Sequence, residues 1–219
     1  MRTQHHIKRS TLLDYAGGRL SAGLSVVAAS HLAWCRECRK AVEDVTDRRE
    51  AAQQESPPAV DLPRRGQTAL KAMDRLPAAA ETASGEVGDF GLPMPLALRL
   101  EGHGLEDLAW RKVFPGVAVR ELELPPGSAG RLRLVRMAPG KGLPEHAHSS
   151  CELSLVLRGA YRDQHGRYTI GDIADLDATA MHRPVAEEEA GDCVCLVAAE
   201  TPVRYRSWTG RLWQRFVGL

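Results

Sequence analysis

Hydrophobic residues recur with a helical period in the first fifty residues of the chain. In "SAGLSVVAASHLAW", residues 21–34, Leu24, Val27, Ala28 and Leu32 are spaced at i, i+3, i+4 and i+8, as on one face of an amphipathic helix. The stretch "STLLDYAGG" predicts a shorter helix that ends at a pair of glycines. A third helix is predicted over residues 36–54, so the start of the chain is expected to form a small helical bundle.

The helical pattern stops at residue 55. The stretch "ESPPAVDLPRRG" carries three prolines and cannot continue a helix. It is followed by "QTALKAMDRL", residues 67–76, which predicts one more short helix. Residues 78–95 are small or polar and are interrupted by glycine and proline, a composition that is typical of linkers. We expect a flexible linker over residues 81–95.

After about residue 96, apolar and polar residues alternate in short runs that glycine and proline turns separate. The runs are "VFPGVAVREL", "GRLRLVRM", "CELSLVLRG", "ADLDA" and "DCVCLVAAETPVRYRSW". Several short strands at this spacing are typical of an all-β sandwich or barrel. The pattern therefore predicts an α+β chain of two domains, with a helical domain over residues 1–80 and an all-β domain over residues 96–219.

Composition and charge narrow the class of protein. Of the 219 residues, 43% are hydrophobic, which is enough for packed cores, and the net charge of +1 gives no basic surface for nucleic acid. No apolar run approaches the roughly 20 residues that span a bilayer, and the start of the chain lacks an apolar signal core. We therefore expect a soluble cytoplasmic protein, in which the five cysteines bind metal, react with oxidants or are buried.

The stretch "HLAWCREC", residues 31–38, contains the first candidate site. Residues three and four apart share a face of a helix, so His31, Cys35 and Cys38 can point at a common centre. Thiolates and imidazoles are the usual ligands of structural zinc, which takes four of them. His5 or His6, before the first helix, would supply the fourth. A thioredoxin-type redox pair fits less well because this segment is predicted to be helical throughout. A chance arrangement of exposed residues is the remaining alternative.

A second candidate site lies in the all-β part. His146 and His148 are two residues apart and face the same side of a strand, and Glu152 begins the neighbouring segment. His182, on a later strand, would complete a set of three histidines and one carboxylate. Such ligands suit zinc, manganese, iron(II) or nickel alike. The residues therefore predict a metal site without fixing the ion, and scattered surface or core histidines are the alternative.

Cys193 and Cys195 in "DCVCLV" are also two residues apart and face the same side of a strand. Two neighbouring thiols can sense an oxidant if their surroundings lower the thiol pKa. The alternative is that both are small core residues of the last strands. Cys151, beside Glu152, is expected to be structural.

The second site carries a resemblance to the cupins. In "GKGLPEHAHSSCELSLVLRG", residues 140–159, the glycines, histidines and glutamate stand at every defined position of the first cupin motif. The second motif, which ends at His182, departs from the cupin pattern at Asp177, Thr179 and Ala186. These departures leave the expected jelly-roll barrel in place but argue against an open enzymatic pocket.

Both motifs in this order resemble the ChrR-type zinc-binding anti-sigma factors. The N-terminal "HH", "LLDYAGGRLS" and "HLAWCREC" are similar to the zinc-binding anti-sigma domain, and residues 96–219 resemble its cupin-like domain. The resemblance implies two zinc ions per chain, one in each domain. The implied ligands are His6, His31, Cys35 and Cys38 in the helical domain, and His146, His148, Glu152 and His182 in the cupin domain.

The resemblance also implies a function. An extracytoplasmic-function sigma factor would be held by the helical domain, kept from RNA polymerase, and released when singlet oxygen or an organic peroxide acts through the cupin domain. This is a regulator and not an enzyme, with no direct contact to nucleic acid or membrane. Six residues of the helices give them more apolar surface than so few helices can bury among themselves, which suggests a partner surface. They are Leu12, Leu13, Tyr15, Leu20, Val26 and Val27. The alternative, which is favoured for any single residue, is that they only pack the bundle.

Two other functions fit the sequence less well than this one. A metal-dependent cupin enzyme, a dioxygenase or isomerase with an appended helical regulatory domain, needs an open metal position, which four protein ligands would close. A DNA-binding zinc module needs a basic stripe for phosphate contacts, and the surroundings of "HLAWCREC" lack one.

Overall fold

The computed structural model describes residues 3–54, 88–201 and 204–205 of the chain. We call residues 3–54 the helical region and the residues from 88 onwards the β region. The helix predicted over residues 67–76 and residues 81–87 of the predicted linker lie outside the described residues. None of the described helices is long and apolar enough to cross a membrane.

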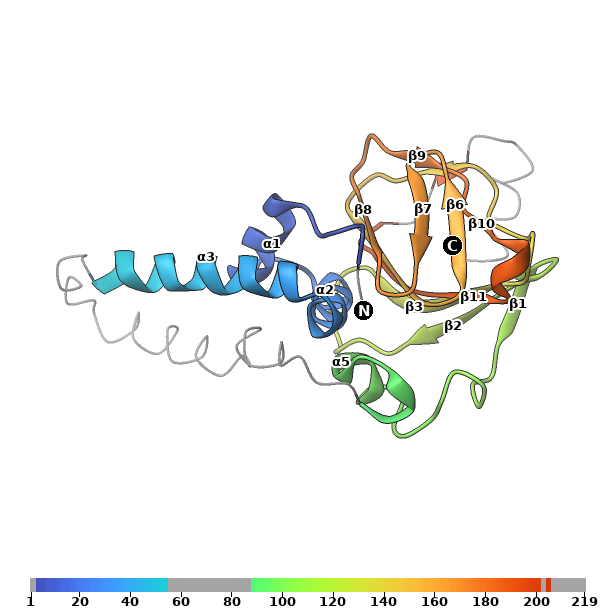
Figure 1. The fold of residues 1–219 in the computed structure, drawn as a ribbon, viewed down its shortest axis with the longest axis horizontal. Helices are drawn as coiled ribbons and strands as arrows, with labels where there is room; N and C mark the ends of the chain where they lie inside the picture. The colour runs from blue at the N-terminus through green and yellow to red at the C-terminus, as the bar shows by residue number, and fades with distance from the viewer. Residues whose placement is uncertain (1–2, 55–87, 202–203, 206–219) are drawn as a thin grey trace.

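The helical region contains the three predicted helices, α1 (Arg9–Ala16), α2 (Ala22–Trp34) and α3 (Arg36–Gln54). Gly17 is the C-cap residue of α1, and Gly18 follows with a φ of +65°, a conformation that favours glycine. Figure 1 shows α2 lying against the β region, whereas α3 extends away from it.

The β region consists of short antiparallel strands, which confirms the predicted all-β architecture. Its strands are β1 (Arg111–Phe114), β2 (Val117–Leu122), β3 (Arg131–Met137), β4 (His146–Ala147), β5 (Glu152–Arg158), β6 (Ala160–Asp163), β7 (Gly166–Thr169), β8 (Ile173–Leu176), β9 (Met181–His182), β10 (Val185–Ala186), β11 (Cys193–Ala199) and β12 (Arg204–Tyr205). Three short helices accompany them, η1 (Asp89–Gly91), α5 (Met94–Ala97) and η2 (Glu188–Ala190).

The strands form three sheets. The largest has the order β1-β2-β3-β11-β5-β8, and two smaller sheets have the orders β10-β6-β7 and β12-β4-β9. Tyr161 of β6 and Tyr168 of β7 pack in one core cluster with Val135 and Val156 of the large sheet. The β10-β6-β7 sheet therefore packs against one face of the large sheet, with the core between them, as in a jelly roll.

The large sheet is buried on both of its faces, because successive side chains of a strand point to opposite sides. On β5, Leu153 and Leu155 face the helical region and join its core cluster. Val156 of the same strand belongs to the inner cluster. Helix α2 covers the outer face, and a Cβ atom at Gly23 would lie 3.3 Å from the carbonyl oxygen of Arg131 on β3. The glycine thus allows the helix to lie close to the sheet.

This packing corrects the expected partner surface. Leu12, Tyr15, Val26 and Val27 are buried in a cluster that includes the outer face of the large sheet. Leu13, by contrast, is 39% exposed. The surplus apolar surface of the helices is therefore largely covered by the sheet of the same chain, whose outer face is also apolar.

The described end of the predicted linker is also part of the packed structure. Residues 88–95 include η1 and the first two residues of α5 rather than an irregular segment. Leu92 and Leu96 are buried in the cluster that the helical region shares with the large sheet. The hydrophobic side chains at this end of the expected linker therefore hold it against the domain core.

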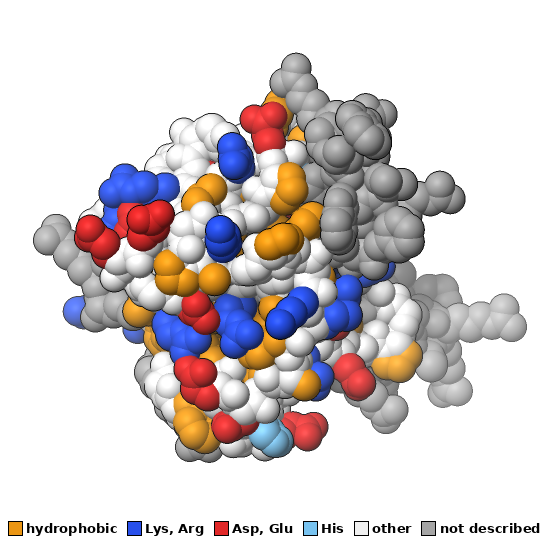
Figure 2. All heavy atoms as spheres, turned by 90° about the vertical axis from the view of Figure 1, so that its right-hand side faces the viewer, with side chains coloured by type: hydrophobic (Ala, Val, Ile, Leu, Met, Phe, Trp, Pro, Cys, Tyr) orange, Lys and Arg blue, Asp and Glu red, His pale blue; other side chains and the backbone are white. Residues whose placement is uncertain are grey.

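The face of the β region that points away from α3 carries charges of both signs. Figure 2 shows Lys and Arg side chains across the middle of this face, with Asp and Glu side chains interspersed and hydrophobic side chains in small groups. This mixture agrees with the near-neutral net charge of the sequence.

Candidate metal sites

The first cluster joins three elements of the helical region. His6 lies in the segment before α1, His31 lies in the last turn of α2, and Cys38 lies in the first turn of α3, with Cys35 between the two helices. One potential ligand atom from each of the four residues lies within 4.8 Å of all the others. The distance from His6 Nδ1 is 3.3 Å to Cys35 Sγ and 3.6 Å to Cys38 Sγ.

A break between the helices brings the two cysteines together. The spacing of His31, Cys35 and Cys38 was interpreted as that of one helix face, but α2 ends at Trp34, and Cys35 has an extended backbone with φ −100° and ψ 104°. Cys35 is thereby the residue before the first turn of α3, and its Sγ accepts a hydrogen bond from the backbone N–H of Cys38 at 3.4 Å. This is the geometry of a helix N-cap, in which a side-chain acceptor satisfies a free N–H group.

The N-cap position also favours a thiolate at Cys35. Hydrogen bonding with the Cys38 thiol lowers the pKa of Cys35, and the hydroxyl of Thr3 donates to the same sulfur at 3.3 Å. The same hydrogen bond raises the pKa of Cys38, because the two sulfurs share one proton. A helix N-terminus stabilises the negative charge as well. The first cluster therefore holds one sulfur ready to bind a cation.

Both histidines of this cluster present one ring nitrogen to the sulfurs and the other to an oxygen. His31 Nδ1 donates to the carbonyl oxygen of Gly171 at 3.0 Å, which leaves Nε2 facing Cys38 Sγ at 3.4 Å. His6 Nε2 lies 3.2 Å from the carboxylate of Glu37. An oxygen partner on the far nitrogen is the usual arrangement of a histidine that binds a metal.

His5 lies elsewhere, which separates the two N-terminal histidines that the sequence left open. Its ring stacks on Tyr168 with centroids 4.2 Å apart, and its Nε2 lies 3.0 Å from the carbonyl oxygen of Arg167. His6 is therefore the residue that the structure brings to His31 and the cysteines.

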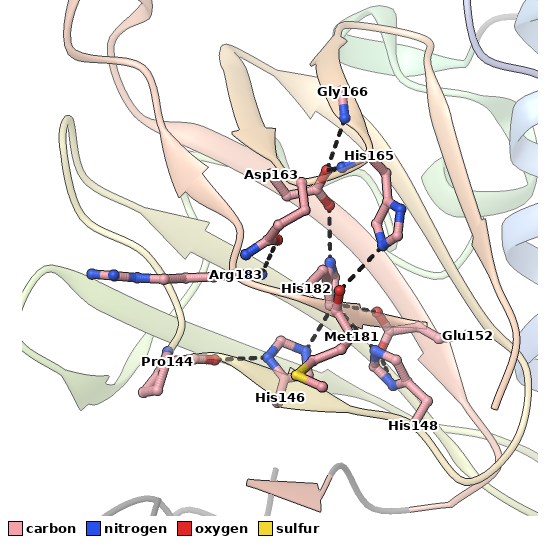
Figure 3. A network of polar contacts seen from close by, with 11 residues as sticks. Pro144, His146, His148, Glu152, Asp163, His165, Gly166, Met181, His182 and Arg183 are labelled. Atoms are coloured by element: carbon pink, nitrogen blue, oxygen red, sulfur yellow. Dashed lines mark hydrogen bonds and ion pairs between the residues drawn. The ribbon is translucent and has the colours of Figure 1, made fainter. Parts of the chain in front are cut away.

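The second cluster lies inside the β region (Figure 3). It contains His146 of β4, Glu152 of β5 and His182 of β9, together with His148. Their potential ligand atoms again lie within 4.8 Å of one another, and all four residues are buried. The Nε2 atom of His182 is 2.9 Å from that of His146 and 3.1 Å from that of His148. Backbone pairing of His146 with His182 aligns the two strands.

Two oxygen acceptors orient the rings of this second cluster. His182 Nδ1 donates to Asp163 Oδ2 at 3.0 Å, and His146 Nδ1 donates to the carbonyl oxygen of Pro144 at 2.8 Å. Both rings therefore turn Nε2 toward the centre. Burial lowers the pKa of His146 to about 3, so its imidazole is neutral at physiological pH.

Both clusters fit a metal ion. Zinc–ligand bond lengths place a sulfur and a nitrogen about 3.6 Å apart around a tetrahedral ion, and two nitrogens about 3.3 Å apart. The distances above lie near these values. In the second cluster, Nδ1 of His148 is buried and has no hydrogen-bond partner among the described residues, although it lies 3.3 Å from Glu152 Oε2. Three imidazoles and a carboxyl group are held close together, and a cation at their centre would bind their lone pairs.

The two candidate redox cysteines, Cys193 and Cys195, both lie on β11. The Sγ atoms of Cys193 and Cys195 are 3.8 Å apart, and both side chains are buried. Hydrogen bonding with Cys193 and burial raise the pKa of Cys195 well above its usual value. Cys195 also lines a cavity of about 50 Å³ beside His146 and Glu152. The resting thiol is therefore protonated, but it lies close to the second cluster.

Three contributors to these sites were not anticipated from the sequence. Asp163 is the last residue of β6, before the turn to β7, where an aspartate is common for turn geometry alone. Glu37 stands inside the Cys-x-x-Cys stretch, and helical periodicity alone does not place it beside His6. Gly171 acts through its backbone carbonyl group, which no side-chain pattern indicates.

Comparison with known proteins extends along the whole chain. Residues 103–202 match the family model of the ChrR cupin-like domain. The chain is 36% identical over 219 residues to the anti-sigma-E factor ChrR of Cereibacter sphaeroides, with 99% of each chain covered. It is similar to the crystal structure of Rhodobacter sphaeroides SigE in complex with the anti-sigma ChrR, with 34% identity, a TM-score of 0.71 and coverage of 90% of this chain and 100% of that chain.

Proposed function

The chain belongs to the ChrR family of anti-sigma factors, and from this premise we propose that it binds and sequesters an extracytoplasmic-function sigma factor. The sequestered sigma factor does not join RNA polymerase, so transcription of its regulon stays off. The observation that carries this proposal is the similarity, over 90% of the chain, to the anti-sigma protein of a solved complex with SigE. Because RNA polymerase is the target, we place the protein in the cytoplasm, with no direct contact to nucleic acid or membrane.

The helical region is the proposed sigma-binding part. His6, His31, Cys35 and Cys38 are the proposed zinc ligands there. A bound zinc ion would act as a structural cross-link between the N-terminal segment, α2 and α3. Cys35 lies between α2 and α3 at the N-cap of the latter, and α3 extends away from the β region. Such an extended helix offers its sides to a partner.

The β region is the proposed sensor of an oxidative signal, singlet oxygen or an organic peroxide. His146, His148, Glu152 and His182 are the proposed ligands of a second zinc ion. The cavity beside them supports this role because a small oxidant inside it would lie next to both the ligands and Cys195. The Cys193–Cys195 pair is one candidate for the reacting groups, the metal site is the other, and simple core packing of the two thiols is the alternative for the pair.

Family membership favours a regulator over a metal-dependent cupin enzyme. The relatives that match along the whole chain are described as anti-sigma factors rather than as dioxygenases or isomerases. Four protein donors also lie close enough to surround one ion in each cluster. A closed structural site does not need the open position that catalysis requires.

A transcription assay tests the proposal. The full-length chain loaded with zinc is mixed with the sigma factor encoded beside it, and core RNA polymerase and a template with the cognate promoter are added afterwards. The expected result is a loss of transcripts that depends on the amount of the chain, with no effect on a template read by the housekeeping sigma factor. Unchanged transcription at a several-fold excess of the chain would contradict the proposal.

A further inference from the structure

The turn between β7 and β8 carries a buried carboxylate that reaches across to the helical region. Asp172 is 1% exposed. Its Oδ1 accepts hydrogen bonds from the backbone N–H groups of Gln4 at 2.6 Å and His5 at 3.0 Å. Its Oδ2 accepts from the backbone N–H of Thr169 at 2.8 Å and from the Thr169 hydroxyl at 2.9 Å. One oxygen thus closes the turn, and the other holds the segment that contains His6.

These hydrogen bonds keep Asp172 charged. Burial alone would raise its pKa, but the backbone N–H groups of Thr169, Gln4 and His5 outweigh burial and lower the pKa. A buried carboxylate with four donors is an anchor whose loss would leave unsatisfied N–H groups. The N-terminal segment is therefore fixed by a charge that belongs to the β region.

The neighbouring residue of the same turn holds a second proposed zinc ligand. The carbonyl oxygen of Gly171 accepts a hydrogen bond from Nδ1 of His31, which is fully buried. Gly171 has a φ of +91°, a conformation that residues with a side chain rarely adopt. The hydrogen bond fixes the ring so that Nε2, rather than Nδ1, faces Cys38.

Strand β8 extends this contact along the N-terminal segment. The backbone N–H of Ile173 approaches the carbonyl oxygen of His5 at 3.5 Å, and Asp175 Oδ2 accepts from the backbone N–H of Lys8 at 2.9 Å. The backbone is therefore held on both sides of His6. Farther along the same strand, Leu176 pairs with Glu152 of the second cluster. One strand thus connects the surroundings of both sites.

We infer that the β7–β8 turn is part of the first metal site, with Asp172 as the positioning residue that holds His6 and His31 in place for the ion. The β region then sets the affinity of the helical region for zinc. By linkage, an ion in the first site strengthens the contact between the two regions to the same extent. The inference rests on the proposed ligands of the first site, and it holds whichever sigma factor is the partner.

Cobalt(II) added to the metal-free full-length chain tests this inference, because cobalt bound to thiolates has a charge-transfer absorption and, of the two proposed ligand sets, only the first contains cysteines. In Asp172→Asn, an amide N–H₂ group replaces one acceptor oxygen and faces N–H donors. We expect cobalt affinity at the thiolate site to fall by about 10- to 100-fold, as for other residues that orient a ligand. The second site should keep its affinity, which total bound cobalt reports.

Two further variants control the experiment. Asp177→Asn removes an exposed ion pair with Lys8 at the end of the same segment and should leave the thiolate site unchanged. Thr169→Val removes one hydrogen bond from Asp172 and keeps the backbone bonds, so a smaller loss is expected even if Asp172→Asn does not fold.

The outcomes separate this inference from the proposed function. Wild-type affinity at the thiolate site in folded Asp172→Asn and Thr169→Val would overturn the inference alone. An equal loss at both sites would also overturn it, because a general loss of structure would then explain the result. A wild-type chain without the thiolate absorption would overturn the proposed ligands themselves.

Discussion

The Nδ1 atom of His31 donates a hydrogen bond to the carbonyl oxygen of Gly171, 3.0 Å away and 140 residues later in the sequence. This contact joins a helix of the N-terminal region to a turn of the β region. It also determines which nitrogen of His31 is free to bind an ion. The proposed sigma-binding region is therefore held in shape partly by residues of the proposed sensor region.

Replacing either cysteine of the first cluster should remove its ion. Cys38→Ser takes away a sulfur donor and the partner that shares a proton with Cys35. We expect zinc affinity at this site to fall by more than about 100-fold, since a lost ligand costs more than a lost orienting residue. Chelator competition measures the affinity. Cys151→Ser is the matched control, because Cys151 lies outside both clusters; a similar loss in that variant would contradict the assignment.

Replacing a histidine of the second cluster should remove one ion and spare the sigma factor. The wild-type chain is expected to hold two zinc ions, and His146→Ala should hold one while binding sigma as before, because His146 belongs to the second cluster and not to the first. Metal analysis by mass spectrometry gives the stoichiometry, and His103→Ala serves as the control. A single ion in the fully loaded wild-type chain would contradict the two-site account.

Asp163 should be needed for metal affinity although it lies behind His182. Its Oδ2 accepts the hydrogen bond from His182 Nδ1, and its Oδ1 accepts from the backbone N–H groups of His165 and Gly166. Asp163→Asn is expected to weaken binding at the second site by about 10- to 100-fold.

The matched control for Asp163 lies beside the same hairpin. Glu187, which follows β10, is paired with Arg162 and Arg167 of the hairpin and is not one of the four residues of the cluster. Glu187→Gln should leave metal affinity unchanged. If Asp163→Asn and Glu187→Gln behave alike in the chelator competition, the orienting role of Asp163 is wrong.

Cys151 should be a slow nucleophile at neutral pH. Burial raises the pKa of its thiol to about 12, and only the thiolate reacts with alkylating agents. At pH 7.5 its alkylation is therefore expected to be about 1000-fold slower than that of an ordinary cysteine. The rate should rise about tenfold per pH unit up to pH 10, as followed by mass spectrometry of the labelled peptide. A rate that levels off near pH 8.5 would show an unperturbed thiol instead.

Local patterns were sufficient to predict the helices and most of the strands. The i, i+3, i+4 spacing of Leu24, Val27 and Ala28 predicted α2, and alternation predicted β3, β5 and β11. The boundary between α2 and α3 at residue 35 was predicted, but the extended backbone of Cys35 was not, because a single such residue leaves helical spacing on both sides almost unchanged.

The contact between the two regions could not be predicted from the sequence. Each region has an apolar face, but nothing in the sequence indicates that one covers the other rather than a partner protein. The near-continuous apolar run of β5, with Leu153, Leu155 and Leu157 facing the helices, was the available signal that this sheet is buried on both sides.

The candidate ligands could be predicted from the sequence because their own side chains bind metals. His31 and Cys38 stand at helical spacing, and His146 and His148 stand at strand spacing. The residues that orient these ligands could not be predicted from the sequence. Gly171 acts through its backbone, and Asp163 and Asp172 lie at the ends of turns, where aspartate is common for local reasons.

The measurement that tests the central claim most directly is a calorimetric titration of the zinc-loaded full-length chain with the sigma factor encoded beside it. The account predicts one sigma factor bound per chain with sub-micromolar affinity, and loss of this binding in Cys38→Ser but not in His146→Ala. A folded wild-type chain with both ions in place that shows no binding to that sigma factor would contradict the account.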